Sequence, residues 1–354
     1  MSVYIIAEIG INFNGSLENC LKMIDLSAQA GCHAAKFQFF TASGMYPKSA
    51  GKIDWKDGEK AYSYDIHEAV KRFELLPEWL DEIMARCIAR NIDFMASVFD
   101  REGLEYLVQK GMNKIKLSSY TITNLPLIEA AAQTGLPIIM STGGATLAET
   151  EEAVRCIQKV HNNIALLHCS IKYPTPLEEV NMGVLDTLKL AFPEVNIGYS
   201  DHTFEVSDAP VQAVYLGATV IEKHITLSKQ MEGPDHFFAL EPDELARMVI
   251  DINEARKRFL NGSGTVQPAI YGSTAKICYE HEKYLRDFAY MTLFAKRTIR
   301  KGDPIPPEAI SILRPGKKQP GLPPKYLKLF SDHTITAKKE IACEDPITWD
   351  AILG

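Results

Sequence analysis

Short runs of β-branched and other apolar residues alternate with amphipathic stretches along the first 260 or so residues of the chain. The runs predict eight strands, at Tyr4–Ile9, Ala34–Phe39, Ile92–Ala96, Lys114–Leu117, Pro137–Met140, Ile164–His168, Asn196–Tyr199 and Thr219–Lys223. The stretches between them predict helices. In Pro77–Arg90, for example, the apolar residues recur with the spacing of one helix face.

Eight strand–helix units in this length predict a (β/α)8 TIM barrel. A doubly wound open sheet gives the same alternation and is the structural alternative. It rarely contains eight regular units, however, and no glycine-rich dinucleotide-binding fingerprint follows the first strand. The barrel is therefore the predicted fold.

Two segments depart from this rhythm. Thr41–Leu76 is a long insertion with Pro47, several glycines and several lysines, which predicts a lid or a disordered loop. After Leu260 the alternation stops, so we expect a barrel domain at residues 1–262, a linker at 263–287 and a small domain at 288–354. Within the small domain we expect short strands at Met291–Ala295, Ile310–Leu313 and His333–Ala337.

Charge and cysteine usage exclude several classes of protein. The formal net charge of −7 is spread along the chain, whereas binding to nucleic acid or to an anionic membrane surface requires a clustered basic face. The seven cysteines form no C-x-x-C pair, which indicates reduced thiols. No run of 18 apolar residues is present, so no membrane span is expected. The expected location is the cytoplasm.

Polar or ionisable residues stand at the carboxyl end of every predicted strand. They are Glu8, Lys36, Gln38, Ser97, Lys116, Ser118, Ser119, Ser141, Thr142, His168, Ser200, Asp201, His202, Glu222, Lys223 and His224. The carboxyl ends of barrel strands meet at one face, where the active sites of such barrels are built. The pattern predicts an enzyme.

The residue types suggest roles for several of these side chains. Lys36 and Lys116 could hold a phosphate or a carboxylate as point charges. The run Ser141-Thr142-Gly143-Gly144 predicts a loop whose backbone N–H groups approach an anion. His202 and His224 could share one divalent metal, or they could be unrelated surface histidines. Glu8 could be a general base, or only the ion-pair partner of the lysines.

Several motifs together resemble the sialic acid synthase family over essentially the whole chain. They are Ala7-Glu8-Ile9-Gly10-Ile11-Asn12-Phe13-Asn14-Gly15, Lys36-Phe37-Gln38, Ile122-Thr123-Asn124-Leu125-Pro126, Ser141-Thr142-Gly143, Tyr173-Pro174-Thr175, Gly198-Tyr199-Ser200-Asp201-His202, Glu222-Lys223-His224 and Gly233-Pro234-Asp235-His236. The tail, with Leu313-Arg314-Pro315-Gly316, resembles the antifreeze-like (SAF) domain of that family.

The resemblance implies a carbon–carbon bond-forming transferase that condenses phosphoenolpyruvate with an N-acylated hexosamine or a related sugar aldehyde. The product would be a nine-carbon 2-keto acid, and phosphate would be released. The resemblance also implies a divalent metal (Mn or Mg) and a homodimer in which each tail domain reaches over the barrel of the other subunit.

The implied site residues fall into four groups. The phosphoenolpyruvate site would be lined by Lys36, Ser97, Lys116, Ser119, Ser141, Tyr173 and Ser200, with Gln38 as a further substrate-binding residue. His202 and His224 would bind the metal, and Asp235 would contact the sugar. Glu8 would handle protons at the reacting carbons.

Four positions depart from the family pattern, mostly on the sugar side of the site. A histidine is replaced by Phe13, a carboxylate by Thr121, an asparagine by Ile171, and the arginine of the tail falls at Tyr290 or Met291. These changes predict an acceptor other than N-acetylmannosamine. Two other functions stay open: a metal-dependent aldolase or lyase acting on a phosphorylated sugar, and a catalytically weakened homologue that binds or acts as a scaffold.

Overall fold

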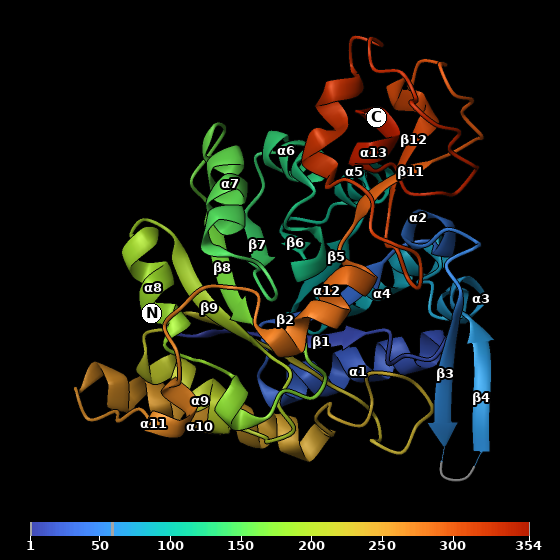
Figure 1. The fold of residues 1–354 in the computed structure, drawn as a ribbon. Helices are drawn as coiled ribbons and strands as arrows, with labels where there is room; N and C mark the ends of the chain where they lie inside the picture. Colours follow the sequence, from blue (N-terminus) through green and yellow to red (C-terminus); the bar gives the residue numbers. More distant parts are fainter. Residues whose placement is uncertain (1, 58–59, 354) are drawn as a thin grey trace.

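The computed structural model describes residues 2–57 and 60–353, and eight parallel strands close into a barrel within them (Figure 1). The strands are β1 (Tyr4–Gly10), β2 (Ala34–Phe39), β5 (Asp93–Val98), β6 (Ile115–Leu117), β7 (Ile138–Ser141), β8 (Ile164–Cys169), β9 (Asn196–Asp201) and β10 (Val220–His224). The helices that follow them in turn are α1 (Leu17–Ala30), α4 (Leu80–Ala89), α5 (Arg101–Gln109), α6 (Leu125–Gln133), α7 (Leu147–Gln158), α8 (Val184–Ala191), α9 (Asp208–Tyr215) and α10 (Pro242–Leu260). Because β1 pairs with both β2 and β10, the predicted barrel is confirmed and the open sheet is excluded.

The interior of the barrel changes from apolar to polar along its axis. Side chains of a strand alternate between two faces, so residues two apart point the same way. One buried cluster consists of Ile6, Ala34, Met95, Ile139, Ala165, Leu167 and Val220. Two residues further along β1, β2 and β5 come Glu8, Lys36 and Ser97. An apolar plug therefore supports a polar mouth at the carboxyl ends of the strands.

The same alternation places other strand-end residues behind the barrel wall. Lys223 Nζ lies 2.5 Å from the carboxylate of Asp201, and both side chains are almost fully buried. His168 Nε2 donates to the carbonyl oxygen of Val180 over 2.7 Å, and its ring packs against Tyr199. Lys223 and Asp201 pair with each other and His168 bonds the backbone, all away from the mouth, so only part of the strand-end pattern belongs to the site.

The described part of the insertion after β2 (residues 41–57 and 60–76) contains regular secondary structure, in contrast to the predicted disordered loop, and its role as a lid stays a prediction. It contains α2 (Ala42–Met45), the antiparallel hairpin β3 (Lys52–Asp57) and β4 (Lys60–Asp65), and α3 (Ile66–Lys71). Asp65 caps α3 by accepting from the N–H groups of His67 and Glu68. Ile66 anchors the base of the hairpin, because it is buried in one cluster with Phe40 and with Met291 of the tail. Figure 1 shows the hairpin projecting beside the barrel.

The remaining elements form the linker and the tail. They are α11 (Pro268–Tyr271), α12 (Lys283–Ala289), β11 (Thr292–Ala295), β12 (Ile310–Leu313) and α13 (Trp349–Ile352). β11 and β12 pair antiparallel and share a hydrophobic cluster of their own with α13. The predicted strand at His333–Ala337 is wrong, since that segment makes only an isolated bridge from Thr336 to Pro304.

The tail lies against the barrel of its own chain. The N–H of Arg314 donates to the carbonyl of Met45, and that of Lys317 donates to Ala50, each over 2.8 Å. The expected domain boundary at 287/288 falls inside α12, which connects the barrel to the tail. None of the helices in the described part of the chain is both long enough and apolar enough to cross a membrane.

The buried His168 predicts a specific loss of stability in acid. Burial lowers the pKa of its imidazole to about 4 from the ordinary 6.5. Between these values the unfolded chain binds more protons than the folded one, so stability falls as the pH falls through that window. We expect this group alone to reduce the free energy of unfolding by about 2 kcal/mol between about pH 7 and about pH 5.

Urea unfolding of the wild type and of His168→Gln at the two pH values measures the effect, since glutamine retains a donor for the carbonyl of Val180. The variant should lose about 2 kcal/mol less than the wild type on acidification. Equal losses in the two proteins would show that the imidazole of His168 titrates normally.

Candidate active site

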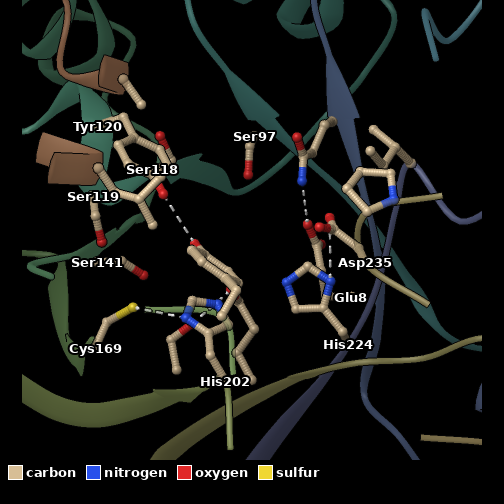
Figure 2. Close-up of a pocket in the computed structure, with 18 of the residues that line it drawn as sticks. Glu8, Ser97, Ser118, Ser119, Tyr120, Ser141, Cys169, His202, His224 and Asp235 are labelled. Atoms are coloured by element: carbon tan, nitrogen blue, oxygen red, sulfur yellow. Dashed lines mark hydrogen bonds and ion pairs between the residues drawn. The ribbon is translucent and has the colours of Figure 1, made fainter. Parts of the chain in front are cut away.

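A cavity of about 530 Å³ lies at the carboxyl ends of the strands. It brings together all twelve residues that the sequence predicts for the site: Glu8, Lys36, Gln38, Ser97, Lys116, Ser119, Ser141, Tyr173, Ser200, His202, His224 and Asp235. Figure 2 shows Ser118, Ser119 and Ser141 on one side of the cavity and Glu8, Asp235 and His224 on the other. The outward-facing His168, Asp201 and Lys223 do not line it.

Four buried charges meet at the floor of the cavity. Lys36 Nζ lies 2.6 Å from Glu8 Oε2 and 3.5 Å from Glu222 Oε1, and Lys116 Nζ lies 3.7 Å from Glu222 Oε1. The strand-end pattern included Glu222, but the predicted site did not. The register of β10 turns it inward, where its Oε1 accepts from Ser200 Oγ. Two carboxylates thus oppose two ammonium groups, which limits the large cost of burying each charge alone.

The pKa values of the two carboxyl groups shift in opposite directions, and so do those of the two ammonium groups. Burial raises the pKa of Glu8 despite the neighbouring Lys36, whereas Lys116 and Lys36 outweigh burial and hold the pKa of Glu222 low. The carboxylates of Glu222 and Glu8 outweigh burial at Lys36 and raise its pKa. For Lys116, burial dominates and lowers the pKa. Glu8 is therefore the carboxyl group of this cluster that protonates most readily.

Hydroxyl groups accompany each lysine. Lys116 Nζ donates to Ser141 Oγ over 2.8 Å, and Lys36 Nζ donates to Ser97 Oγ over 3.2 Å. The side chains of Ser118 and Ser119 line the same wall. Ammonium and hydroxyl groups together suit an anionic ligand that accepts several hydrogen bonds.

The predicted role of the glycine loop is wrong. The N–H of Gly143 donates to Ser119 Oγ, and that of Gly144 donates to Glu282 Oε1. The N–H of Thr142 is likewise occupied by the carbonyl of Leu167. Because these donors are already engaged, contacts to an anion come from side chains and not from this loop.

Residues of the linker hold the same loop from outside. Lys276 Nζ donates to the carbonyls of Thr142 and Ala145 over 2.6 and 2.5 Å. The hydroxyl of Tyr290 donates to the carbonyl of Gly143 over 2.6 Å. The loop that carries Ser141 is therefore positioned by the segment that joins the barrel to the tail.

His202 and His224 face each other with ring centroids 5.4 Å apart. His202 Nδ1 lies 2.6 Å from the carbonyl oxygen of Ser170, which fixes its proton on Nδ1 and leaves Nε2 as an acceptor. His224 Nδ1 is buried without a hydrogen-bond partner and lies 3.8 Å from Asp235 Oδ2. Burial lowers the pKa of both imidazoles, so both favour the neutral form that binds metal.

Asp235 completes this side of the cavity. Burial raises the pKa of its carboxyl group to about 6, and Glu8 adds to the shift while His202 opposes it. Across residues 2–57 and 60–353, no cluster of three or more His, Cys, Asp or Glu side chains is close enough to hold a metal ion. Two neutral imidazoles and one nearby carboxylate are the donors present, and they are the ligand types that a divalent metal accepts.

The residues that depart from the family pattern lie in different places relative to the cavity. Thr121 is buried outside the cavity and donates to the carbonyl of Ser118. The N–H of Ile171 donates to Glu282 Oε1. Placing the arginine of the tail at Tyr290 or Met291 is wrong, because Arg314 of the tail lines the cavity.

Arg314 belongs to an aromatic wall that the sequence did not predict. Its guanidinium lies 4.7 Å from the ring centroid of Tyr120, 5.1 Å from that of Phe99 and 5.8 Å from that of Tyr46. Phe288 of α12 lines the same side. These residues come from the strand ends, the insertion, the linker and the tail, so no local signal in the sequence connects them.

Comparisons with known proteins place the chain in a family. A family model described as the NeuB family matches residues 23–264. The spore coat polysaccharide biosynthesis protein SpsE of Bacillus subtilis is 38% identical over 99% of this chain and 94% of its own length. The N,N'-diacetyllegionaminic acid synthase of Legionella pneumophila is 32% identical over 89% of this chain and 86% of its own length.

Solved structures agree with this placement. The structure of SpsE from Bacillus subtilis matches with a TM-score of 0.87 at 37% identity, over 100% of this chain and 96% of that one. The N-acetylneuraminic acid synthetase of Leptospira borgpetersenii matches with a TM-score of 0.66 at 35% identity, over 76% of this chain and 88% of that one. The family model leaves the tail unmatched, so its assignment as an antifreeze-like domain stays a prediction. The chain belongs to the NeuB family.

Proposed function

We propose that this chain condenses phosphoenolpyruvate with a sugar aldehyde to give a nine-carbon 2-keto acid of the sialic acid type, with release of phosphate. The proposal rests on relatives named as synthases of such acids. It also rests on one cavity that combines ammonium, carboxyl, hydroxyl and imidazole groups. The observation that carries it is a set of buried, unpartnered polar atoms on residues that line this cavity. They are Ser118 Oγ, Glu222 Oε2, His224 Nδ1 and Arg314 Nε.

Such atoms are costly unless a ligand satisfies them. In this proposal Lys36, Lys116 and the hydroxyls beside them bind phosphoenolpyruvate. Gln38, Asp235 and Arg314 face the sugar, and Tyr173 lies between the two sides with its ring 4.2 Å from that of His202. The anionic and the neutral reactant thus approach from opposite sides of one cavity.

The reaction joins C3 of phosphoenolpyruvate to the aldehyde carbon, a water adds at C2, and the bond from C2 to the phosphate oxygen then breaks. Glu8, whose pKa is raised by burial, can hold or accept a proton, and Gln38 Nε2 donates to its Oε1 over 3.1 Å and fixes the carboxyl group. Lys36 and Lys116 stabilise the charge on the departing phosphate.

We further propose that His202 and His224 hold a divalent metal, Mn or Mg, with Asp235 at its side. A metal bound there would polarise the aldehyde oxygen as a Lewis acid. The free Nε2 of His202 and the unpartnered Nδ1 of His224 are the atoms that fit this role. A homodimer in the cytoplasm remains part of the proposal. Exchange of the tails is not required for it, because Arg314 of the same chain lines the cavity.

Phosphoenolpyruvate binding is the first test. A ligand present at about 100 times its Kd stabilises the folded state by about 2.7 kcal/mol, so phosphoenolpyruvate with Mn should raise the melting temperature. Phosphate release with a panel of aldoses then identifies the acceptor. No stabilisation by phosphoenolpyruvate would exclude the synthase. Turnover of a phosphorylated sugar alone would establish an aldolase or lyase, and binding without any turnover would establish a weakened homologue.

Removal of either imidazole tests the metal site. His202→Ala and His224→Ala should abolish metal-dependent phosphate release and reduce bound metal measured after gel filtration, because one imidazole cannot retain the ion. His168→Gln is the matched control at about pH 7.5, since His168 lies behind the barrel wall. Full activity in either alanine variant would remove the histidines from the mechanism.

Removal of one ammonium group tests the anion side. Lys116→Met loses a charge-assisted contact worth about 1.5–3 kcal/mol, so we expect the Kd for phosphoenolpyruvate to rise roughly 10- to 100-fold. Titration calorimetry measures this Kd, and a melting curve checks that the variant folds. Lys22→Met, at an exposed position of α1 outside the cavity, is the control. An unchanged Kd in Lys116→Met would place the phosphate elsewhere.

A further inference from the structure

A second cavity of about 430 Å³ adjoins the active site. The two cavities share the lining residues Ile11, Gln38, Tyr46, Pro234 and Arg314, so they adjoin at these side chains. The rest of the second cavity is built by the insertion and its surroundings. We call it the insertion chamber and define it by Phe40, Met45, Ile53, Ala69, Val70 and Phe73.

The insertion chamber is apolar. The six residues that define it carry only hydrocarbon, aromatic or thioether side chains. Its other lining residues include the polar Asn14 and Gln38 and the charged Arg72, Glu232 and Arg314. Arg72 and Glu232 are exposed, and Arg72 stands over the ring of Tyr64 at 5.1 Å. Water inside such a space finds few hydrogen-bond partners, and an apolar group gains from displacing it.

The guanidinium group of Arg314 lies at the junction of the two cavities. Arg314 lines both of them, and its Nε is buried without a hydrogen-bond partner. Among the ion pairs of the described residues, none involves Arg314; three aromatic rings hold its guanidinium in place. An oxygen acceptor at the junction would therefore satisfy a buried donor.

We infer that the acceptor sugar carries an acylamino group longer than acetyl. Its carbonyl oxygen faces Arg314 and its hydrocarbon chain occupies the insertion chamber. This inference rests on the proposed function, and it adds the length of the acyl group that the acceptor carries. Such a sugar presents three groups in order: a polar ring, a carbonyl oxygen and a hydrocarbon chain. They match, in the same order, the polar active-site cavity, Arg314 and the apolar insertion chamber.

The apolar area that each added methylene buries predicts how much more tightly the longer acyl chains bind. Each buried methylene contributes about a fourfold gain in affinity. We therefore expect the Kd to fall by about this factor for each methylene added beyond acetyl until the chamber is filled, and to rise when the chain exceeds it. A site built only for acetyl would show a loss of affinity from the first added methylene.

The experiment uses the full-length protein with phosphoenolpyruvate and N-acetyl-, N-butanoyl- and N-hexanoyl-mannosamine. Calorimetry gives the Kd of each sugar, and phosphate release gives kcat/KM. Ala69→Leu places a larger side chain in the insertion chamber and should reduce the ratio of hexanoyl to acetyl affinity at least tenfold. Ala191→Leu, at the exposed end of α8 and outside both cavities, is the matched control and should leave the ratio unchanged.

The outcomes separate this inference from the proposed function. Phosphate release without a preference for the longer acyl chains would overturn the inference about the chamber and leave the synthase intact. The same would follow if Ala69→Leu had the same ratio of hexanoyl to acetyl affinity as the wild type. Absence of phosphoenolpyruvate binding would overturn the synthase. In that case the ratio of the affinities for the hexanoyl and the acetyl sugar, measured by calorimetry, would still test whether the insertion chamber binds the acyl chain. Should Ala69→Leu fail to fold, Ile53→Ala widens the chamber and should shift the best chain length upwards.

Discussion

The contact between two carboxylates and two ammonium groups inside the barrel is the constraint on which the rest of the site depends. Glu8, Lys36, Lys116 and Glu222 are each no more than 4% exposed. Any one of these charges alone in that position would cost several kcal/mol, so the barrel can bury them only as a set. The set in turn requires the parallel register that brings β1, β2, β6 and β10 to the same height.

The apolar plug beneath the cluster makes this arrangement stable. Ile6 precedes Glu8, and Ala34 precedes Lys36, by one strand period. Close packing below fixes the backbone from which the charges project, while the hydroxyls of Ser97, Ser141 and Ser200 complete their hydrogen bonds above. The polar mouth is therefore a continuation of the core and not a separate surface feature.

The sequence was sufficient to predict the barrel and the twelve lining residues. The barrel follows from local periodicity, and ten of the twelve residues follow from the position of strand ends, whereas Tyr173 and Asp235 follow from the family resemblance. It was not sufficient to distinguish Glu222 from Lys223, since a one-residue difference decides which face of a strand a side chain occupies. The hairpin in the insertion was missed because its many charged residues interrupt the apolar alternation of its strands. The positions of Arg314 and Glu282 depend on contacts between segments more than a hundred residues apart, which no local pattern contains.

The linker shows how those distant contacts become part of the site. Glu282 and Lys276 bind the polar backbone groups of the loop after β7, and α12 then carries the chain to β11. As a result the loop cannot present its own N–H groups to an anion, and the anion side must rely on the lysines. The same path leads the tail back to the barrel, where Arg314 closes the opposite side. The side of the cavity that carries the lysines is thus built mainly by the strand ends, whereas the opposite side is assembled from the insertion, the linker and the tail.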